Sequence, residues 1–170
     1  MKQPSQGFTL LELLVVMLLI GIMATLATPS FLAFGERNAR SAAVNQLQST
    51  LAFARNTAIT QRMDITVCPT DDARENCINE WSGPILVVAG DQQDGFTASD
   101  IVRFFPPAQR TGIEYSRNWR RIKFTPLGHS SGYNGRFWVC PSGAMEGREL
   151  VLSQLGRLRI AEQPYDCSAT

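Results

Sequence analysis

The chain has 170 residues, of which 44% are apolar and 18% are charged, so it is long enough for one globular domain and short for two. This composition excludes a disordered, a collagen-like or a purely coiled-coil chain. The formal net charge of +1 points to no partner, but residues 8–100 carry 5 basic and 10 acidic side chains, whereas residues 101–160 carry 10 basic and 3 acidic ones. The later part of the chain is therefore expected to face an anionic partner.

An apolar segment near the amino terminus predicts a transmembrane helix. Residues 8–28 contain Glu12 as their only charged residue, and as a helix they are about 31 Å long, which matches the hydrocarbon core of a bilayer. A cleavable secretory signal would have several basic residues before this segment and a small-residue cleavage site after it. Lys2 is the one basic residue before the segment, so we expect the segment to remain as an anchor.

The start of this segment resembles a known processing signal. Gly7 is followed by Phe8-Thr9-x-x-Glu12 and an apolar helix, which is similar to the type III signal of type IV pilins and pseudopilins. The resemblance implies that residues 1–7 are a leader, that a prepilin peptidase cleaves after Gly7, and that Phe8 becomes the N-methylated terminus.

Glu12 is expected to act in subunit assembly. A carboxylate inside a hydrocarbon span is costly unless it has a partner. The free amine of Phe8 in a neighbouring subunit would supply the matching charge in a filament. An ordinary membrane anchor that tolerates Glu12 is the alternative.

We expect residues 29–62 to continue this helix as an amphipathic segment. Pro29 lacks a backbone donor and Gly35 is a weak helix former, so we expect a kink or a melted turn between them. The helix is expected to end near residues 61–64 and to pack an apolar stripe on the protein's own sheet. The stripe has alternating spacings of three and four residues, at Val44, Leu47, Leu51, Ala54 and Ala58.

Residues 63–170 are expected to form a β-rich head. Short apolar runs alternate there with segments rich in Gly, Pro, Asn and Asp, which is typical of strands joined by turns. One long helix followed by eight strands gives an α+β fold. The predicted strands are residues 65–68, 85–89, 101–105, 112–115, 121–124, 137–140, 149–153 and 157–160.

Two short motifs in the head extend the resemblance over the whole chain. Phe124-x-Pro126-x-Gly128 and Gly156-Arg157-x-Arg159 are similar to elements of the GspH/FimT family of minor pilins and pseudopilins. The resemblance implies a type IV pilin-like fold, with the long helix packed on the head. It also implies a single-pass inner-membrane protein with a periplasmic head, which joins other major and minor pilins in a pilus on the cell surface.

The four cysteines are expected to form disulfides, because a head outside the cytoplasmic membrane lies in an oxidising compartment. Three connectivities are possible, and we favour Cys68–Cys77 with Cys140–Cys167. The alternative, a zinc site, is disfavoured because the chain has no Cys-x-x-Cys pair and one histidine. No metal and no cofactor is expected.

Two patterns resemble enzyme or metal motifs. Residues 128–132 match the Gly-x-Ser-x-Gly pattern of hydrolases, but no histidine follows them to complete a triad, and we interpret them as a turn-forming loop. Asp91, Asp94 and Asp100 depart from the EF-hand spacing and are interpreted as a solvated loop. The chain is not expected to be an enzyme.

The basic half of the head predicts contacts with phosphate groups, because nine of its ten basic residues are arginines, which bind phosphate bidentately. On a strand, Arg157 and Arg159 point to one face about 7 Å apart, a spacing that fits successive phosphates, while Leu158 points to the core. Further candidate contacts are Gly156, Arg120, Arg121 and Lys123, and the aromatic side chains that can stack on bases if exposed are Tyr115, Trp119, Tyr133 and Trp138. The alternative is that the arginines pair with Glu114, Glu146 and Glu149 or with neighbouring pilins.

Three functions follow from these features. The resemblance implies that the head binds double-stranded DNA through the Gly-Arg-x-Arg element, as FimT-like minor pilins do in natural transformation. A FimU-like role in pilus assembly without DNA binding is the first alternative. A GspH-like pseudopilin role in type II secretion is the second.

Overall fold

The computed structural model describes residues 9–92 and 95–169, except for the side chains of residues 25–33 and of residue 169. The leader, residues 1–7, and the expected cleavage and methylation site at Gly7 and Phe8 lie outside the described residues. The chain forms two compact units, Met1–Arg37 and Asn38–Thr170.

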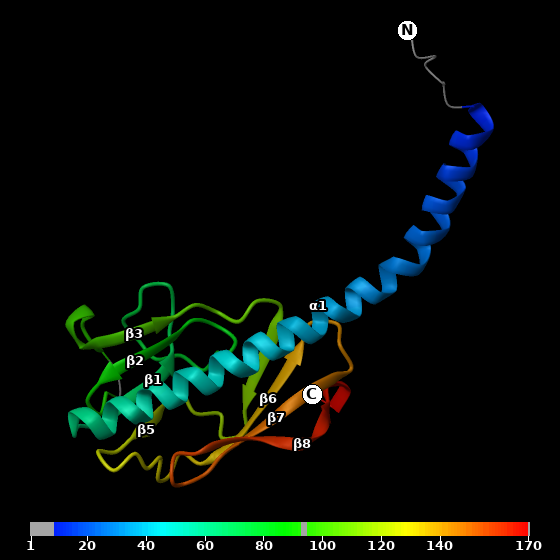
Figure 1. The fold of residues 1–170 in the computed structure, drawn as a ribbon. Helices are drawn as coiled ribbons and strands as arrows, with labels where there is room; N and C mark the ends of the chain where they lie inside the picture. The colour runs from blue at the N-terminus through cyan, green and yellow to red at the C-terminus, as the bar shows by residue number, and fades with distance from the viewer. Residues whose placement is uncertain (1–8, 93–94, 170) are drawn as a thin grey trace, which may run out of the picture. The chain divides into compact units, whose positions relative to one another are not determined.

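The helix α1 covers Leu10–Gln61 and contributes to both units (Figure 1). The helix continues through Pro29 and Gly35, so of the kink or melted turn expected between them the melted turn is absent. A proline removes one backbone hydrogen bond, and the bonds of the neighbouring turns in a helix of 52 residues remain to hold the local conformation.

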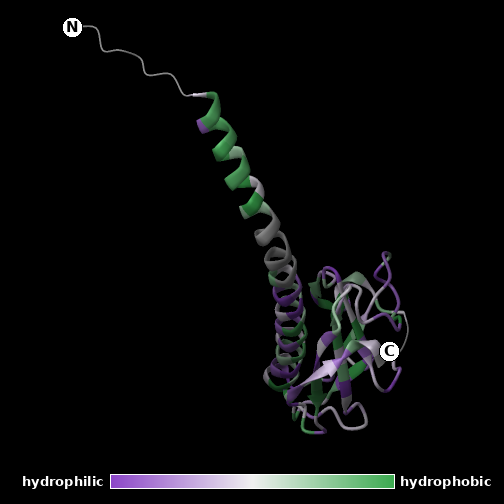
Figure 2. Ribbon diagram, turned by 90° about the vertical axis from the view of Figure 1, so that its right-hand side faces the viewer, coloured by the Kyte–Doolittle hydropathy of each residue, from purple (hydrophilic) through white to green (hydrophobic). Residues whose placement is uncertain are grey.

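The first unit presents an apolar helix surface. The large apolar side chains between Leu10 and Met23 are 48–79% exposed, and Figure 2 shows this part of the helix in the colour of hydrophobic residues. Such a continuous apolar surface requires a cover, either of lipid or of other protein.

In the part of the chain that the structure describes, no helix is both long enough and apolar enough to cross a membrane.

The head contains two four-stranded antiparallel sheets. The first sheet has the order β3-β2-β1-β5, and the second has the order β4-β6-β7-β8. All eight predicted strands are confirmed, although β7 ends before Ser153 and β8 begins one residue after Arg157. The strands are β1(Ile65–Pro69), β2(Ile85–Ala89), β3(Ile101–Phe105), β4(Thr111–Tyr115), β5(Ile122–Phe124), β6(Gly135–Pro141), β7(Glu146–Leu152) and β8(Leu158–Asp166).

The second half of α1 is packed against both sheets and forms one core with them (Figure 1). All five residues of the predicted stripe are buried, and none exceeds 5% exposure. They share a cluster with Ile65, Val67 and Ile122 of the first sheet and with Phe137 and Leu150 of the second. The expectation that the stripe packs on the protein's own sheets is confirmed, and the head buries two sheet faces at once.

The head contains two disulfides, and the first lies in a second buried cluster with Leu86, Val88 and Phe96. Cys68 of β1 is bonded to Cys77 in the following loop, and Cys140 of β6 is bonded to Cys167, which follows β8. This is the pairing favoured from the sequence. The second disulfide passes over Gly147 of β7, where an added Cβ atom would lie 2.5 Å from the Val139 carbonyl oxygen and 2.6 Å from Cys167 Sγ. Position 147 therefore has room only for glycine.

We predict that Gly147→Ala destabilises the head by about 1–3 kcal/mol, because the added methyl group displaces backbone or disulfide atoms. Gly112→Ala is the matched control in the same sheet. Its Cβ atom would lie 3.6 Å from the Cys140 carbonyl oxygen, which is an ordinary contact. Urea denaturation under oxidising conditions measures the two free energies of unfolding, and equal values for the two variants would contradict the prediction.

Candidate functional site

The Gly-Arg-x-Arg element forms the turn that leads into β8. The Gly156 amide donates to the Ser153 carbonyl at 2.9 Å, and the Arg157 amide donates to Ser153 Oγ at 3.1 Å. Arg157 and Arg159 are exposed, whereas Leu158 between them is half-buried and packs against the core. Both guanidinium groups are therefore available at the surface of the head. The expected alternation along one strand holds only in part, because β8 begins at Leu158 and leaves Arg157 in the preceding turn, and Ile160 is exposed.

The two family motifs lie in contact with each other. An added Cβ atom at Gly156 would lie 2.2 Å from the Gly128 carbonyl oxygen, so only a glycine permits this approach. Both glycines have left-handed backbone conformations, with φ of +72° at Gly156 and +74° at Gly128. The fold thus joins the end of Phe124-x-Pro126-x-Gly128 to the start of Gly156-Arg157-x-Arg159.

Arg55 of α1 fixes this contact from the helix side. Its Nε donates to the Gly128 carbonyl oxygen at 3.1 Å, and its Cδ would lie 3.3 Å from a Cβ atom at Gly156. Sequence reasoning did not select Arg55, which appears there as one polar residue beside the apolar stripe. Its position four residues after Leu51, on the border of the buried face, is the one signal that the sequence offers.

A cleft of about 470 Å³ separates α1 from the beginning of β8. Three arginines from two elements surround it, and none of the described residues that line it is acidic. The lining residues are Gln48, Leu51, Ala52, Arg55, Asn56, Gly156, Arg157, Leu158 and Arg159. The cleft concentrates positive charge beside hydrogen-bond donors, which suits a phosphate or another anionic group.

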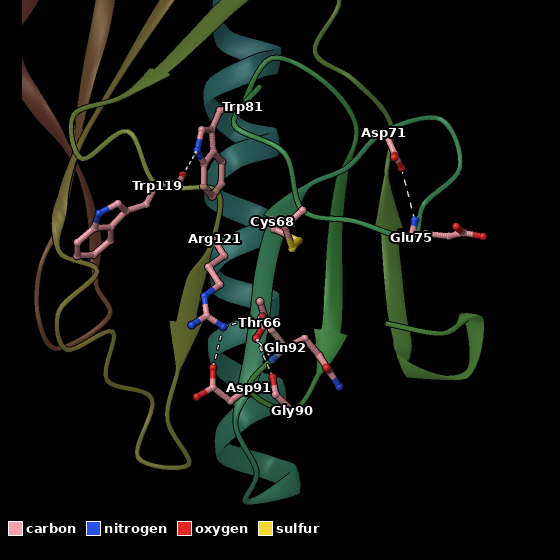
Figure 3. The surroundings of a disulfide bond; sticks show 11 residues. Thr66, Cys68, Asp71, Glu75, Trp81, Gly90, Asp91, Gln92, Trp119 and Arg121 are labelled. Carbon is pink, nitrogen blue, oxygen red and sulfur yellow. Dashed lines mark hydrogen bonds and ion pairs between the residues drawn. A yellow bond between two sulfur atoms is a disulfide. The ribbon is translucent and has the colours of Figure 1, made fainter. Parts of the chain in front are cut away.

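Arg121 and Lys123 are not in this cleft. They lie at and beside β5 of the other sheet and are paired with Asp91, at 2.9 Å for each cation (Figure 3 shows the Arg121 pair). Arg121 also donates to the Gln92 carbonyl at 2.6 Å. The hydrogen bond from Lys123, with further attraction from both cations, lowers the pKa of Asp91, and the same hydrogen bond raises the pKa of Lys123. Lys123 also lies 3.8 Å from Asp64, so the two cations face two carboxylates within the head.

The other expected contacts are also engaged in the head. Arg120 is exposed and takes part in an intramolecular interaction. Tyr115 is buried and donates to the Tyr133 carbonyl, so it does not offer a stacking surface. Trp119 packs edge-on against Tyr133, and Trp138 stacks on Tyr165. Of the alternative pairs, the structure contains Arg136 with Glu149 at 3.2 Å.

Thr9 and Glu12 of the processing motif begin α1. The Glu12 amide donates to Thr9 Oγ1 at 3.3 Å, and Glu12 is the acidic residue of the first turn. A threonine followed three residues later by a glutamate is typical of helix starts, and a carboxylate there interacts favourably with the helix dipole. The Thr-x-x-Glu spacing therefore has a local structural use in addition to the expected role of Glu12 in assembly.

The serine of the Gly-x-Ser-x-Gly segment has a structural role. Ser130 is fully buried and its Oγ donates to the Ser153 carbonyl at 2.9 Å, so it holds the loop against the Gly156 turn. Its amide donates to the Gln154 carbonyl at 3.0 Å.

Within residues 9–92 and 95–169, no cluster of three or more potential metal ligands occurs.

The architecture and the sequence comparisons agree on the class of protein. The fold is similar to that of two crystal structures described as the type IV minor pilin FimU from Pseudomonas aeruginosa. The first has a TM-score of 0.64 at 23% identity and covers 79% of this chain and 98% of that one. The second has a TM-score of 0.61 at 22% identity and covers 75% and 98%. The fold is that of a type IV minor pilin.

The chain belongs to the GspH family, because the family model for the type II transport protein GspH matches residues 43–156. The prokaryotic N-terminal methylation motif matches residues 2–28. A protein from Pseudomonas aeruginosa described as a fimbrial protein is 32% identical over 100 residues. That match covers 55% of this chain and 64% of the relative, so the chain spans less than two thirds of the relative's length.

We predict that Asp91→Asn lowers the free energy of unfolding by up to about 1 kcal/mol at neutral pH, since the pairs are partly exposed and screened. The pKa of Asp91 is lowered in the folded head, so its stabilising contribution is present above the ordinary aspartate pKa and is lost as the pH falls through the lowered value. Urea denaturation at neutral pH and well below the ordinary aspartate pKa measures this difference.

Asp72→Asn is the control, because Asp72 is exposed in the loop closed by Cys68–Cys77. An effect of Asp91→Asn that is equally large at both pH values would contradict the role of its ionised carboxylate.

Proposed function

We propose that this minor pilin binds double-stranded DNA with its head, through Arg157 and Arg159, and acts in DNA uptake. The observation that carries the proposal is the exposed Gly-Arg-x-Arg turn beside a cleft without acidic lining residues among those described. Arginines with no internal carboxylate partner keep their charge for an external anion. Contacts of this type are made with phosphate groups and therefore carry little sequence preference.

Arg120, Arg121 and Lys123 have at most a secondary part in this proposal. Arg121 and Lys123 would have to break their Asp91 pairs before they bind phosphate. Such an exchange of one anion for another contributes less net affinity than a contact made by an unpaired cation.

We further propose that the protein reaches the pilus by the pilin route. A prepilin peptidase removes residues 1–7, Phe8 is methylated, and residues 8–28 anchor the chain in the inner membrane with a periplasmic head. The match to the N-terminal methylation motif and the exposed apolar side chains from Leu10 to Met23 support this route. Other pilins then cover the apolar helix, and Glu12 pairs with the amine of Phe8 in a neighbouring subunit.

A role in pilus assembly without DNA binding is the second candidate. It is favoured by the fold likeness to FimU and by the relative described as a fimbrial protein. A pseudopilin of type II secretion is the third candidate, in line with the description of the matching family model. Genomic neighbourhood separates the pilus from the secretion system, and DNA binding separates the first candidate from the second.

We predict that the purified full-length chain in zwitterionic detergent binds a 30-bp duplex of random sequence, and that Arg157→Ala with Arg159→Ala abolishes most of this binding. The affinity should fall with salt, because each phosphate contact adds about 0.9 to the log–log slope. Fluorescence anisotropy over a salt series measures both quantities.

Arg110→Ala is the control for this experiment, because Arg110 is exposed and is not among the residues that line the cleft. It removes one positive charge elsewhere on the head and should leave the affinity and the salt slope near those of the wild type. Wild-type affinity in the double arginine variant would show that the site is misplaced. Absence of binding by the wild type at low salt would favour the assembly role.

We predict that protein from cells with an active prepilin peptidase begins at N-methylated Phe8. Intact-mass spectrometry should give the mass of the chain without residues 1–7 and with one added methyl group. Gly7→Val is expected to block cleavage, since the residue before the cleaved bond is then too large. A wild-type protein that still begins at Met1 would refute this processing route.

A further inference from the structure

The cleft beside α1 has two walls, and the Gly-Arg-x-Arg element accounts for one of them. Arg157 and Arg159 stand on the β8 side, whereas Gln48, Arg55 and Asn56 stand on the helix side. A guanidinium group and two side-chain amides on the helix wall are donors of the kind that bind phosphate oxygens.

Arg55 is held in place through its Nε atom. Its Nε donates to the Gly128 carbonyl, which leaves the four N–H donors of its two Nη atoms for another partner. The hydrogen bond restricts the side chain before any ligand binds, and the missing Cβ atom at Gly156 leaves room for Arg55 Cδ. A restricted guanidinium group loses less conformational entropy on binding than a free one.

We infer that Arg55 is a third phosphate-binding residue, and that the DNA backbone runs in the cleft between α1 and the start of β8. This inference rests on the proposed DNA binding by Arg157 and Arg159. Arg157 in the turn before β8 and Arg159 on β8 contact phosphates from one wall of the cleft, and Arg55 adds a contact from the opposite wall. Gln48 and Asn56 then donate to the same backbone from the helix.

Arg55 has a structural role through Gly128, so its test must separate charge from position. Arg55→Lys keeps the positive charge, and Arg55→Gln removes it, while both lose the Nε hydrogen bond. A phosphate contact displaces a counterion, whereas a purely structural contribution does not. The salt slope therefore distinguishes the two roles.

The expected result is a slope that is smaller by about 0.9 in Arg55→Gln and close to that of the wild type in Arg55→Lys. Between 50 and 200 mM salt, this difference makes the loss of affinity of Arg55→Gln smaller by about 3.5-fold. The measurement uses the full-length chain in zwitterionic detergent and the same 30-bp duplex.

Arg110→Gln is the matched control, since it removes the same charge at the other end of the second sheet. The register places Thr111 opposite Pro141 and Leu158 in line with Leu152 and Gly135, six residues or about 20 Å along β6. Arg110→Gln should keep the wild-type slope.

A second variant covers the case in which Arg55→Gln does not fold. Gln48→Glu places a negative charge in the cleft and leaves the Arg55–Gly128 hydrogen bond intact, so it should weaken binding at least several-fold at 50 mM salt. Gln109→Glu, beside Arg110, is its control and should bind as the wild type does.

Three outcomes would overturn the inference. If Arg157→Ala with Arg159→Ala loses binding while Arg55→Gln keeps the wild-type slope, DNA binding stands and Arg55 is only structural. If Gln48→Glu binds as tightly as the wild type, the DNA does not enter the cleft. If the wild type itself does not bind, the proposed function fails and this inference fails with it.

Discussion

The head depends on one stripe of the long helix that serves two sheets. Leu47 and Leu51 are almost fully buried, and alanines at positions 43, 54 and 58 allow the strands to approach the helix closely. Each antiparallel sheet has an apolar face that must be covered, and the helix covers both in a single core. Polar substitution within this stripe would therefore expose the inner faces of both sheets together.

The candidate site is a product of the same packing. Because α1 packs against both sheets, Arg55 at the border of its buried stripe reaches the loop after β5 and the turn before β8. The glycines at positions 128 and 156 permit this approach, since a side chain at position 156 would collide with the Gly128 carbonyl. The packing of the core therefore sets the shape of the basic cleft, and the turns at Gly128 and Gly156 permit the close approach at its edge.

Which basic residues of the head can attract an external anion depends more on their pairing with carboxylates than on how many there are. The later part of the chain is rich in arginine, but Arg121 and Lys123 are bound to Asp91 in the loop after β2, and Arg136 is bound to Glu149. Exposed pairs of this kind contribute little stability. They do, however, compensate the charge of those cations, which then attract an external anion less strongly. Arg157 and Arg159 differ because they line a cleft without acidic neighbours among the described residues.

The sequence by itself determined the elements and their order, because these depend on local periodicity. The spacing of Val44, Leu47 and Leu51 predicted the buried stripe, and alternating apolar runs predicted all eight strands to within a few residues. It also indicated the family, through short motifs whose own residues lie within a few positions of one another. Of the kink or melted turn expected near Pro29, the melted turn does not occur, because the helical bonds around one proline hold the backbone in place.

Only the tertiary structure decided which distant residues meet. Arg55 and Gly128 are separated by 73 residues and Arg121 and Asp91 by 30, and no local pattern encodes either contact. The arginines near β5 and those near β8 look alike in the sequence, and the fold places a carboxylate beside one group and a cleft beside the other. Side-chain contacts across two sheets and a helix depend on packing in three dimensions, which a periodicity along the chain does not contain.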